Sequence, residues 1–112
     1  MVKIEAFLRP AALEQVQKAL ADIGIAGLSV LEVRGYGRQR GHREVYRGAE
    51  YTVDFVPKIK IEVAVSDEVK QQAIDAIIKA AKTGQVGDGK VFVVPVNEAV
   101  RVRTGETGDS AL

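Results

Sequence analysis

Residues 58–65 read KIKIEVAV and have an apolar side chain at every second position. This alternation predicts a β-strand with one buried face. A helix should follow, with Ser66 as its N-cap and acidic residues in its first turn. Its buried stripe recurs at helical spacing and consists of Val69, Ala73, Ile77 and Ala80. Residues 91–96 predict a further strand, so this half of the chain has the order strand, helix, strand.

The first half of the chain repeats this order. Residues 2–8 alternate between apolar and polar side chains and predict another strand. Pro10 suits the first turn of a helix. The apolar positions of that helix are Leu13, Val16, Leu20 and Ile23. Gly24 suits a left-handed C-terminal end, and residues 28–36 predict the second strand.

Two strand–helix–strand units in one chain are the signature of the ferredoxin-like fold. We therefore expect an α+β protein in which two helices cover one face of a four-stranded antiparallel sheet. A length of 112 residues suits a single domain over residues 1–112. Residues 38–54, between the second and third strands, have no clean period. Loops longer than ~12–15 residues without structure of their own are uncommon unless they are functional or disordered.

The composition excludes several classes of function. With 16 basic and 15 acidic residues, the chain has no net field to recruit nucleic acid or a membrane surface. It has no cysteine, and its one histidine, His42, cannot by itself form a zinc site or a Ser-His-Asp triad. RNA binders of this fold need a platform of aromatic side chains, and only Phe7 and Phe92 could serve. We expect an intracellular, soluble protein that is not an enzyme and does not bind nucleic acid.

The most informative segment is residues 83–90, which read TGQVGDGK. Backbone N–H groups of such a glycine-rich loop can surround an anion. The spacing of glycines before Lys90 matches a phosphate loop, but Val91 stands where that motif needs Ser or Thr. The predicted helix also precedes the loop, so we exclude a P-loop ATPase. An anion-binding loop and an ordinary helix C-cap with a turn are the remaining interpretations.

Two further groups of residues are candidates for anion contacts. Arg101 and Arg103 lie on one face of a predicted extended segment, where they could clamp phosphate oxygens or simply face solvent. Gly35, Gly37 and Gly41 lack the spacing of a dinucleotide-binding fingerprint. They indicate a flexible or closely approached backbone.

Several segments together resemble the PII family of nitrogen-signalling proteins. Residues 46–51, YRGAEY, are similar to the modification-loop signature of that family, and residues 83–93, TGQVGDGKVFV, to its second signature. The resemblance also includes residues 35–42, 57–60 and 101–108, and so extends over the whole chain. It implies a homotrimer whose sheets pack around the threefold axis, with nucleotide sites between subunits.

The resemblance implies which residues bind ligands. The ATP or ADP site would comprise Gly35, Gly37, Arg38, Gln39, Lys58, Thr83, Gly87, Asp88, Gly89, Lys90, Arg101 and Arg103, the last two from an adjoining subunit. Gln39 would help to coordinate Mg²⁺ on ATP, and 2-oxoglutarate would complete the coordination shell. The 2-oxoglutarate contacts would be Arg9, Gln39, Lys58 and Gly87, with Lys58 paired to the distal carboxylate.

The implied function is nitrogen, carbon and energy signalling, in which ligands change the shape of loop 38–54 and other proteins read it. Implied partners are an ammonium channel, an adenylyltransferase, a histidine kinase of nitrogen transcription and an arginine-synthesis kinase. Arg47 would enter the channel pore. Tyr51 would be uridylylated or adenylylated by a nucleotidyltransferase, which makes the protein a phosphoprotein. The implied location is the cytoplasm, with membrane association through the channel.

Two alternative functions stay open on the sequence. A triphosphate beside Lys90 and two arginines has some of the electrostatics of an ATP-hydrolysing or phosphoryl-transfer enzyme, although Asp88 is the only carboxylate in the loop. The other alternative is a PII-like trimer that senses a different small molecule. Phosphate turnover and the order of ligand affinities distinguish the three.

Overall fold

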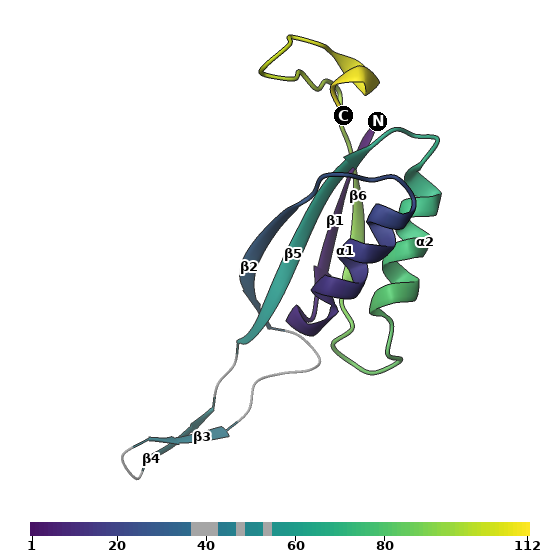
Figure 1. Ribbon diagram of the computed structural model, residues 1–112. Coiled ribbons are helices and arrows are strands. Elements are labelled where there is room, and N and C mark those ends of the chain that lie inside the picture. Colours follow the sequence, from purple (N-terminus) through teal and green to yellow (C-terminus); the bar gives the residue numbers. More distant parts are fainter. Residues whose placement is uncertain (37–42, 47–48, 53–54) are drawn as a thin grey trace.

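The computed structural model describes residues 1–36, 43–46, 49–52 and 55–112, and for 43–46 and 49–52 it describes the backbone. Its main sheet has four antiparallel strands in the order β2-β5-β1-β6 (Figure 1). Their bounds are Val2–Leu8 (β1), Ser29–Gly35 (β2), Val56–Val65 (β5) and Lys90–Pro95 (β6). The two central strands, β1 and β5, are the ones whose alternation is clearest in the sequence.

Two helices cover one face of this sheet, which confirms the expected ferredoxin-like fold (Figure 1). They are α1, Leu13–Asp22, which follows a short 3₁₀ turn at Pro10–Ala12 (η1), and α2, Lys70–Ala81. The core lies between the layers, where Ile4 and Ile61 from the sheet meet Leu20 and Ile77 from the helices, each at most 1% exposed. Full burial of one such side chain stabilises the fold by roughly 1.5–3 kcal/mol.

The predicted end of α1 is confirmed, whereas the predicted start of α2 is not. Gly24 has φ of 90°, the left-handed conformation predicted after α1. The prediction that Ser66 caps α2 is wrong, because the helix starts at Lys70 and its N-cap, Val69, makes no side-chain cap. The Ser66 carbonyl instead accepts the Val69 N–H in a turn that precedes the helix. Because a turn separates β5 from the helix, α2 begins four residues after Ser66. The type of residue at position 66 does not indicate that such a turn is present.

The other face of the main sheet is polar at its centre. Lys3 lies 3.0 Å from Glu62, and Lys60 lies 3.2 Å from Glu5, so the two middle strands are cross-linked by ion pairs. Beside them, the rings of Phe7 and Phe92 meet edge to face with centroids 6.0 Å apart. Neither helix of the described chain covers this face.

A second, two-stranded sheet lies within the loop expected at residues 38–54. Strand β3, Arg43–Tyr46, pairs antiparallel with β4, Ala49–Thr52. The long loop expected between the second and third strands of the main sheet therefore contains a short hairpin. Four-residue strands are too short for alternation to be recognised, while a local hairpin needs only a short connection.

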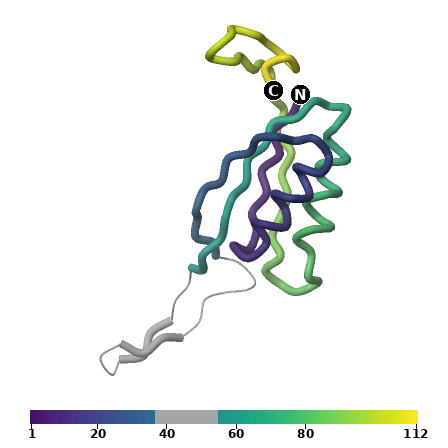
Figure 2. Tube along the Cα trace, viewed as in Figure 1, coloured from purple at the N-terminus to yellow at the C-terminus, as the bar shows by residue number. Residues whose placement is uncertain are grey.

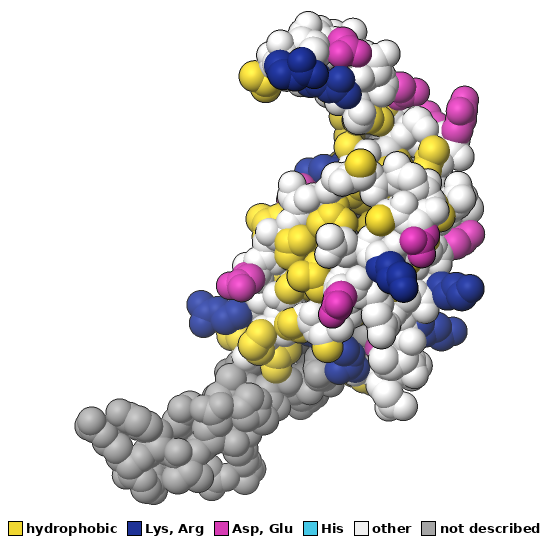
Figure 3. Space-filling view, viewed as in Figure 1, with side chains coloured by type: hydrophobic (Ala, Val, Ile, Leu, Met, Phe, Trp, Pro, Cys, Tyr) yellow, Lys and Arg dark blue, Asp and Glu magenta, His cyan; other side chains and the backbone are white. Residues whose placement is uncertain are grey.

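The chain ends on the same end of the sheet as it begins (Figure 2). The Val96 N–H, just after β6, donates to the Met1 carbonyl over 3.2 Å. In the space-filling view, charged side chains are spread over the helical layer, and apolar ones gather beside it toward β2 (Figure 3). None of the helices in the described part of the chain is long and apolar enough to cross a membrane.

Candidate functional site

The glycine-rich segment 83–90 connects α2 to β6 and is closed into a ring by one carboxylate. Asp88 accepts hydrogen bonds from the N–H groups of Thr83 and Gly84, both over 2.8 Å, and from the Thr83 hydroxyl. The Asp88 N–H in turn donates to the Gln85 carbonyl over 3.3 Å. The segment is therefore a defined loop with its own internal bonds.

All three glycines of this loop, Gly84, Gly87 and Gly89, have a positive φ. Gly87 and Gly89 have φ of 104° and 107°, which side chains rarely adopt. At Gly89 there is also no space, because a Cβ atom would lie 1.7 Å from the Phe7 carbonyl oxygen. The loop backbone thus lies directly against the end of β1.

Basic side chains from the ends of β1 and β5 bind the carbonyl groups of the loop. Arg9 Nη2 donates to the Val86 carbonyl over 2.6 Å, and Lys58 Nζ donates to the Gly87 carbonyl over 2.8 Å. Arg9 Nε is buried and lies 3.5 Å from Asp88 Oδ1. The expected ligand residues Arg9, Lys58, Gly87 and Asp88 therefore meet at one end of the sheet.

The electrostatics of this end follow from these contacts. The Thr83 hydroxyl and backbone donors of Thr83 and Gly84, with Arg9 nearby, lower the pKa of Asp88 from 3.8 to about 2. Burial, and then the positive charge of Arg9, lower the pKa of Lys58, while Asp88 opposes this shift. Asp88 is therefore an ionised carboxylate that is bound by the loop itself.

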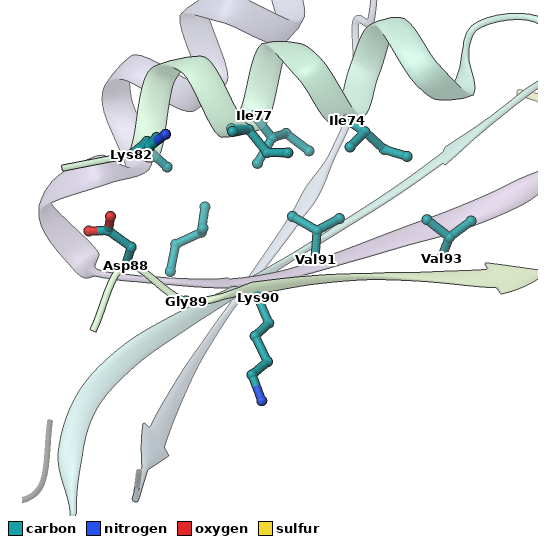
Figure 4. A pocket seen from close by; sticks show the side chains of 11 residues that line it. Ile74, Ile77, Lys82, Asp88, Gly89, Lys90, Val91 and Val93 are labelled. Carbon is teal, nitrogen blue, oxygen red and sulfur yellow. The ribbon is translucent and has the colours of Figure 1, made fainter. Parts of the chain in front are cut away.

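A cavity of about 370 Å³ lies between α2 and β6, next to the loop. Ile74, Ile77, Val91 and Val93 point into it, and Lys82 and Asp88 lie at its loop end (Figure 4). Lys90 points to the opposite side of the sheet (Figure 4). Its register partner Phe7 shares that side, so the Lys90 ammonium lies on the polar sheet face and outside the apolar cavity.

Gly35 is the next expected nucleotide residue in this region. It ends β2, and a Cβ there would lie 3.3 Å from Lys58 Cγ, which agrees with a closely approached backbone. Gly37, Arg38, Gln39 and Arg47 lie outside the described residues. Tyr51 lies in β4, opposite Glu44 in register.

The two arginines after β6 do not join the loop within one chain. The prediction that Arg101 and Arg103 share one face of an extended segment is wrong, because the chain turns there and the Gly105 N–H donates to the Arg101 carbonyl over 2.8 Å. Arg101 pairs with Glu106 over 3.1 Å. This C-terminal segment, which ends in the 3₁₀ turn Gly108–Ala111 (η2), lies at the end of the sheet opposite loop 83–90 (Figures 1 and 2).

Sequence reasoning did not find the ion pairs of the polar sheet face, Lys3 with Glu62 and Lys60 with Glu5. The alternating pattern does put these four side chains on the polar faces of two strands. Which of them meet depends on the strand register, in which Lys3 is opposite Ala64 and Glu5 is opposite Glu62. No single strand contains that information.

Three comparisons with known proteins point to the same family. A family model described as nitrogen regulatory protein P-II matches residues 1–106. The proteins named nitrogen regulatory protein P-II from Haemophilus influenzae and Azospirillum brasilense are each 56% identical over 112 residues, covering 100% of both chains. A crystal structure of Arabidopsis thaliana PII bound to citrate superposes with a TM-score of 0.82 at 41% identity, covering 99% of this chain and 91% of that one.

Proposed function

This chain belongs to the nitrogen regulatory protein P-II family, and from that membership we propose that it is a signalling regulator that binds ATP or ADP together with 2-oxoglutarate. The observation that carries the proposal is loop 83–90, whose glycines let backbone N–H groups approach an anion closely. Lys58 and Lys90 both lie on the polar face of the main sheet and add positive charge there. The family consists of signal-transduction regulators, and we propose no catalytic step.

The phosphate groups would be held by Thr83 and by Gly87 to Lys90, with Gly35 at the adjacent strand end. The remaining contacts, Gly37, Arg38 and Gln39, come from the segment that follows β2. The C-terminal segment that contains Arg101 and Arg103 lies at the other end of its own sheet (Figure 1), so these arginines would reach a phosphate only in another copy of the chain. We therefore propose a homotrimer in which each site is shared by two subunits.

The metal and the metabolite would bind next to the phosphates. Among the described residues no cluster of three acidic, histidine or cysteine side chains could hold a metal ion, and the Asp88 carboxylate is bound by the loop. Mg²⁺ would thus arrive on ATP oxygens, with Gln39 as its protein ligand. Lys58 would pair with a carboxylate of 2-oxoglutarate, with Arg9 and Gly87 beside it. That Arabidopsis PII binds citrate, also a polycarboxylate, supports this ligand class.

The output would pass through residues 38–54. A ligand that favours one shape of this segment changes which proteins it binds, since binding and shape are linked. We propose an ammonium channel contacted by Arg47, an adenylyltransferase, a nitrogen histidine kinase or an arginine-synthesis kinase as partners. Nucleotidylation of Tyr51 would add charge and bulk to the same surface. The protein would work in the cytoplasm and reach the membrane through the channel.

Complementation between subunits tests the proposal. Lys90→Ala and Arg103→Ala should each weaken Mg-ATP binding in calorimetry, since each site needs both residues. A trimer assembled from both variants contains some boundaries with an intact Lys90 on one side and an intact Arg103 on the other, and should regain part of the binding. No recovery in mixed trimers, with each variant folded, would contradict the shared site. A wild-type chain that does not bind Mg-ATP would contradict the function itself.

A further inference from the structure

Arg9 makes two contacts with loop 83–90, one hydrogen bond and one ion pair. Nη2 donates to the Val86 carbonyl over 2.6 Å, and the buried Nε lies 3.5 Å from Asp88 Oδ1. The two residues it contacts are on opposite sides of Gly87. Arg9 therefore acts on the part of the loop where the backbone is left-handed.

The first contact determines which way a peptide group points. In a trans peptide the C=O and the next N–H are antiparallel. Holding the Val86 carbonyl toward the end of β1 therefore directs the Gly87 N–H the other way. Lys58 holds the Gly87 carbonyl in a similar manner over 2.8 Å. The N–H that follows the Gly87 carbonyl, that of Asp88, donates to the Gln85 carbonyl within the loop. The Gly87 N–H is therefore the amide that this arrangement can direct toward an anion.

The second contact concerns charge. Asp88 is a carboxylate inside a loop that we propose binds a polyphosphate, and an uncompensated negative charge there would repel the ligand. Its ring of donors from Thr83 and Gly84 is formally neutral. Arg9 lies at ion-pair distance from this carboxylate, and the positive charge of Lys58 also interacts with it. The carboxylate can therefore close the loop without a net repulsive charge.

We propose that Arg9 is a positioning residue for loop 83–90, which it orients through Val86 and neutralises through Asp88, and that it affects anion binding through the loop. This inference rests on the proposed nucleotide function. It also gives the Arg9–Asp88 pair a role for which neither residue needs to touch the ligand. The separate contributions of orientation and charge can be measured with different substitutions.

Calorimetry of the full-length chain with Mg-ATP tests the charge contribution. Arg9→Gln should weaken binding ~10-fold, as expected for a lost bond between charged groups. Asp88→Asn in that background should recover part of the loss, because the uncompensated carboxylate is removed. Lys18→Gln, an equal loss of charge at an exposed position of α1, is the control and should change nothing. Wild-type affinity of Arg9→Gln, or purely additive effects of the two substitutions, would overturn the proposal.

Hydrogen exchange of the ligand-free chain tests the positioning. The N–H groups of Thr83 and Gly84, which are bound to Asp88, should exchange ~10-fold faster in Arg9→Gln, and core amides such as that of Ile61 should not. Arg9→Lys keeps the positive charge but lacks the planar guanidinium group. Relative to Arg9→Gln, it should restore the affinity for Mg-ATP more than the exchange protection of Thr83 and Gly84. Unchanged exchange at both amides would overturn the proposal whether or not nucleotide binds. If the unsubstituted chain did not bind Mg-ATP, that result would instead contradict the proposed function.

Discussion

The ammonium group of Lys58 donates a 2.8 Å hydrogen bond to the carbonyl oxygen of Gly87. This bond joins β5 to the loop that precedes β6, across the end of β1. The Lys58 ammonium has three donors, so a carboxylate that binds it would lie beside the Gly87 carbonyl. The proposed metabolite site and the proposed phosphate loop are therefore in direct contact.

Replacing Lys58 should uncouple the metabolite from the nucleotide. In Lys58→Met the apolar stem remains but the charge is lost, so 2-oxoglutarate binding in the presence of Mg-ATP should fall by ~10-fold or more. Calorimetric titration measures this effect, with Lys18→Met as the matched loss of charge on an exposed helix surface. Equal affinity of wild type and Lys58→Met for 2-oxoglutarate would exclude the proposed carboxylate contact.

The lowered pKa of Lys58 predicts how carboxylate binding depends on pH. Burial and Arg9 destabilise the charged ammonium, so its pKa lies below the ordinary value of 10.5. As pH rises toward that lowered pKa the ammonium loses its proton and the attraction for a carboxylate is lost. Affinity for 2-oxoglutarate, measured from about pH 7 to about pH 11, should therefore fall with a midpoint below the ordinary lysine value of 10.5. A midpoint at or above 10.5 would contradict the prediction.

The Asp88 ring should open in acid. Because the folded-state pKa is about 2 and the ordinary value is 3.8, the ring stabilises the fold above pH 3.8 and this contribution is lost as pH falls toward 2. Carboxyl ¹³C chemical shifts give the titration midpoint directly. Thr83→Val removes the hydroxyl donor and should raise the pKa of Asp88 toward 3.8. An unchanged midpoint in Thr83→Val would show that the hydroxyl bond is not the cause.

Two glycines of the loop should differ in their response to alanine. Gly89→Ala should destabilise the fold by about 3 kcal/mol, because strain at φ of 107° adds to a collision with the Phe7 carbonyl. Gly84→Ala has a similar φ of 87° but open space, and should cost about 1–2 kcal/mol. Urea unfolding measures both free energies. Equal losses would mean that the contact with β1 does not matter.

The buried centre of β5 should show a graded response. Ile61 is 0% exposed, so Ile61→Ala should lower the free energy of unfolding by about 2–5 kcal/mol and Ile61→Val by about 0.5–1.5 kcal/mol. The same urea experiment measures this series. A loss below 1 kcal/mol for Ile61→Ala would contradict the described core.

Local patterns were enough to predict most of the fold. The alternation in residues 2–8 predicted β1 to its exact bounds, and that in residues 58–65 predicted β5 with two residues missing at its start. Such patterns work because one face of each strand is buried under the helices. They failed at Ser66, where a turn precedes the helix, and they did not indicate the short β3–β4 hairpin within the predicted loop.

The sequence alone also identified loop 83–90 as a candidate anion site. The glycines, the aspartate and the lysine that suggest such a site can be recognised from residue type and spacing without knowledge of the fold. Only the tertiary structure decided what holds this loop. Arg9 and Val86 are 77 positions apart, and they meet because β1 lies between β5 and β6 in the sheet. The same topology puts Arg101 at the opposite end. A residue's type is a local property, but its partners depend on strand order and register, which are set by packing of the whole chain.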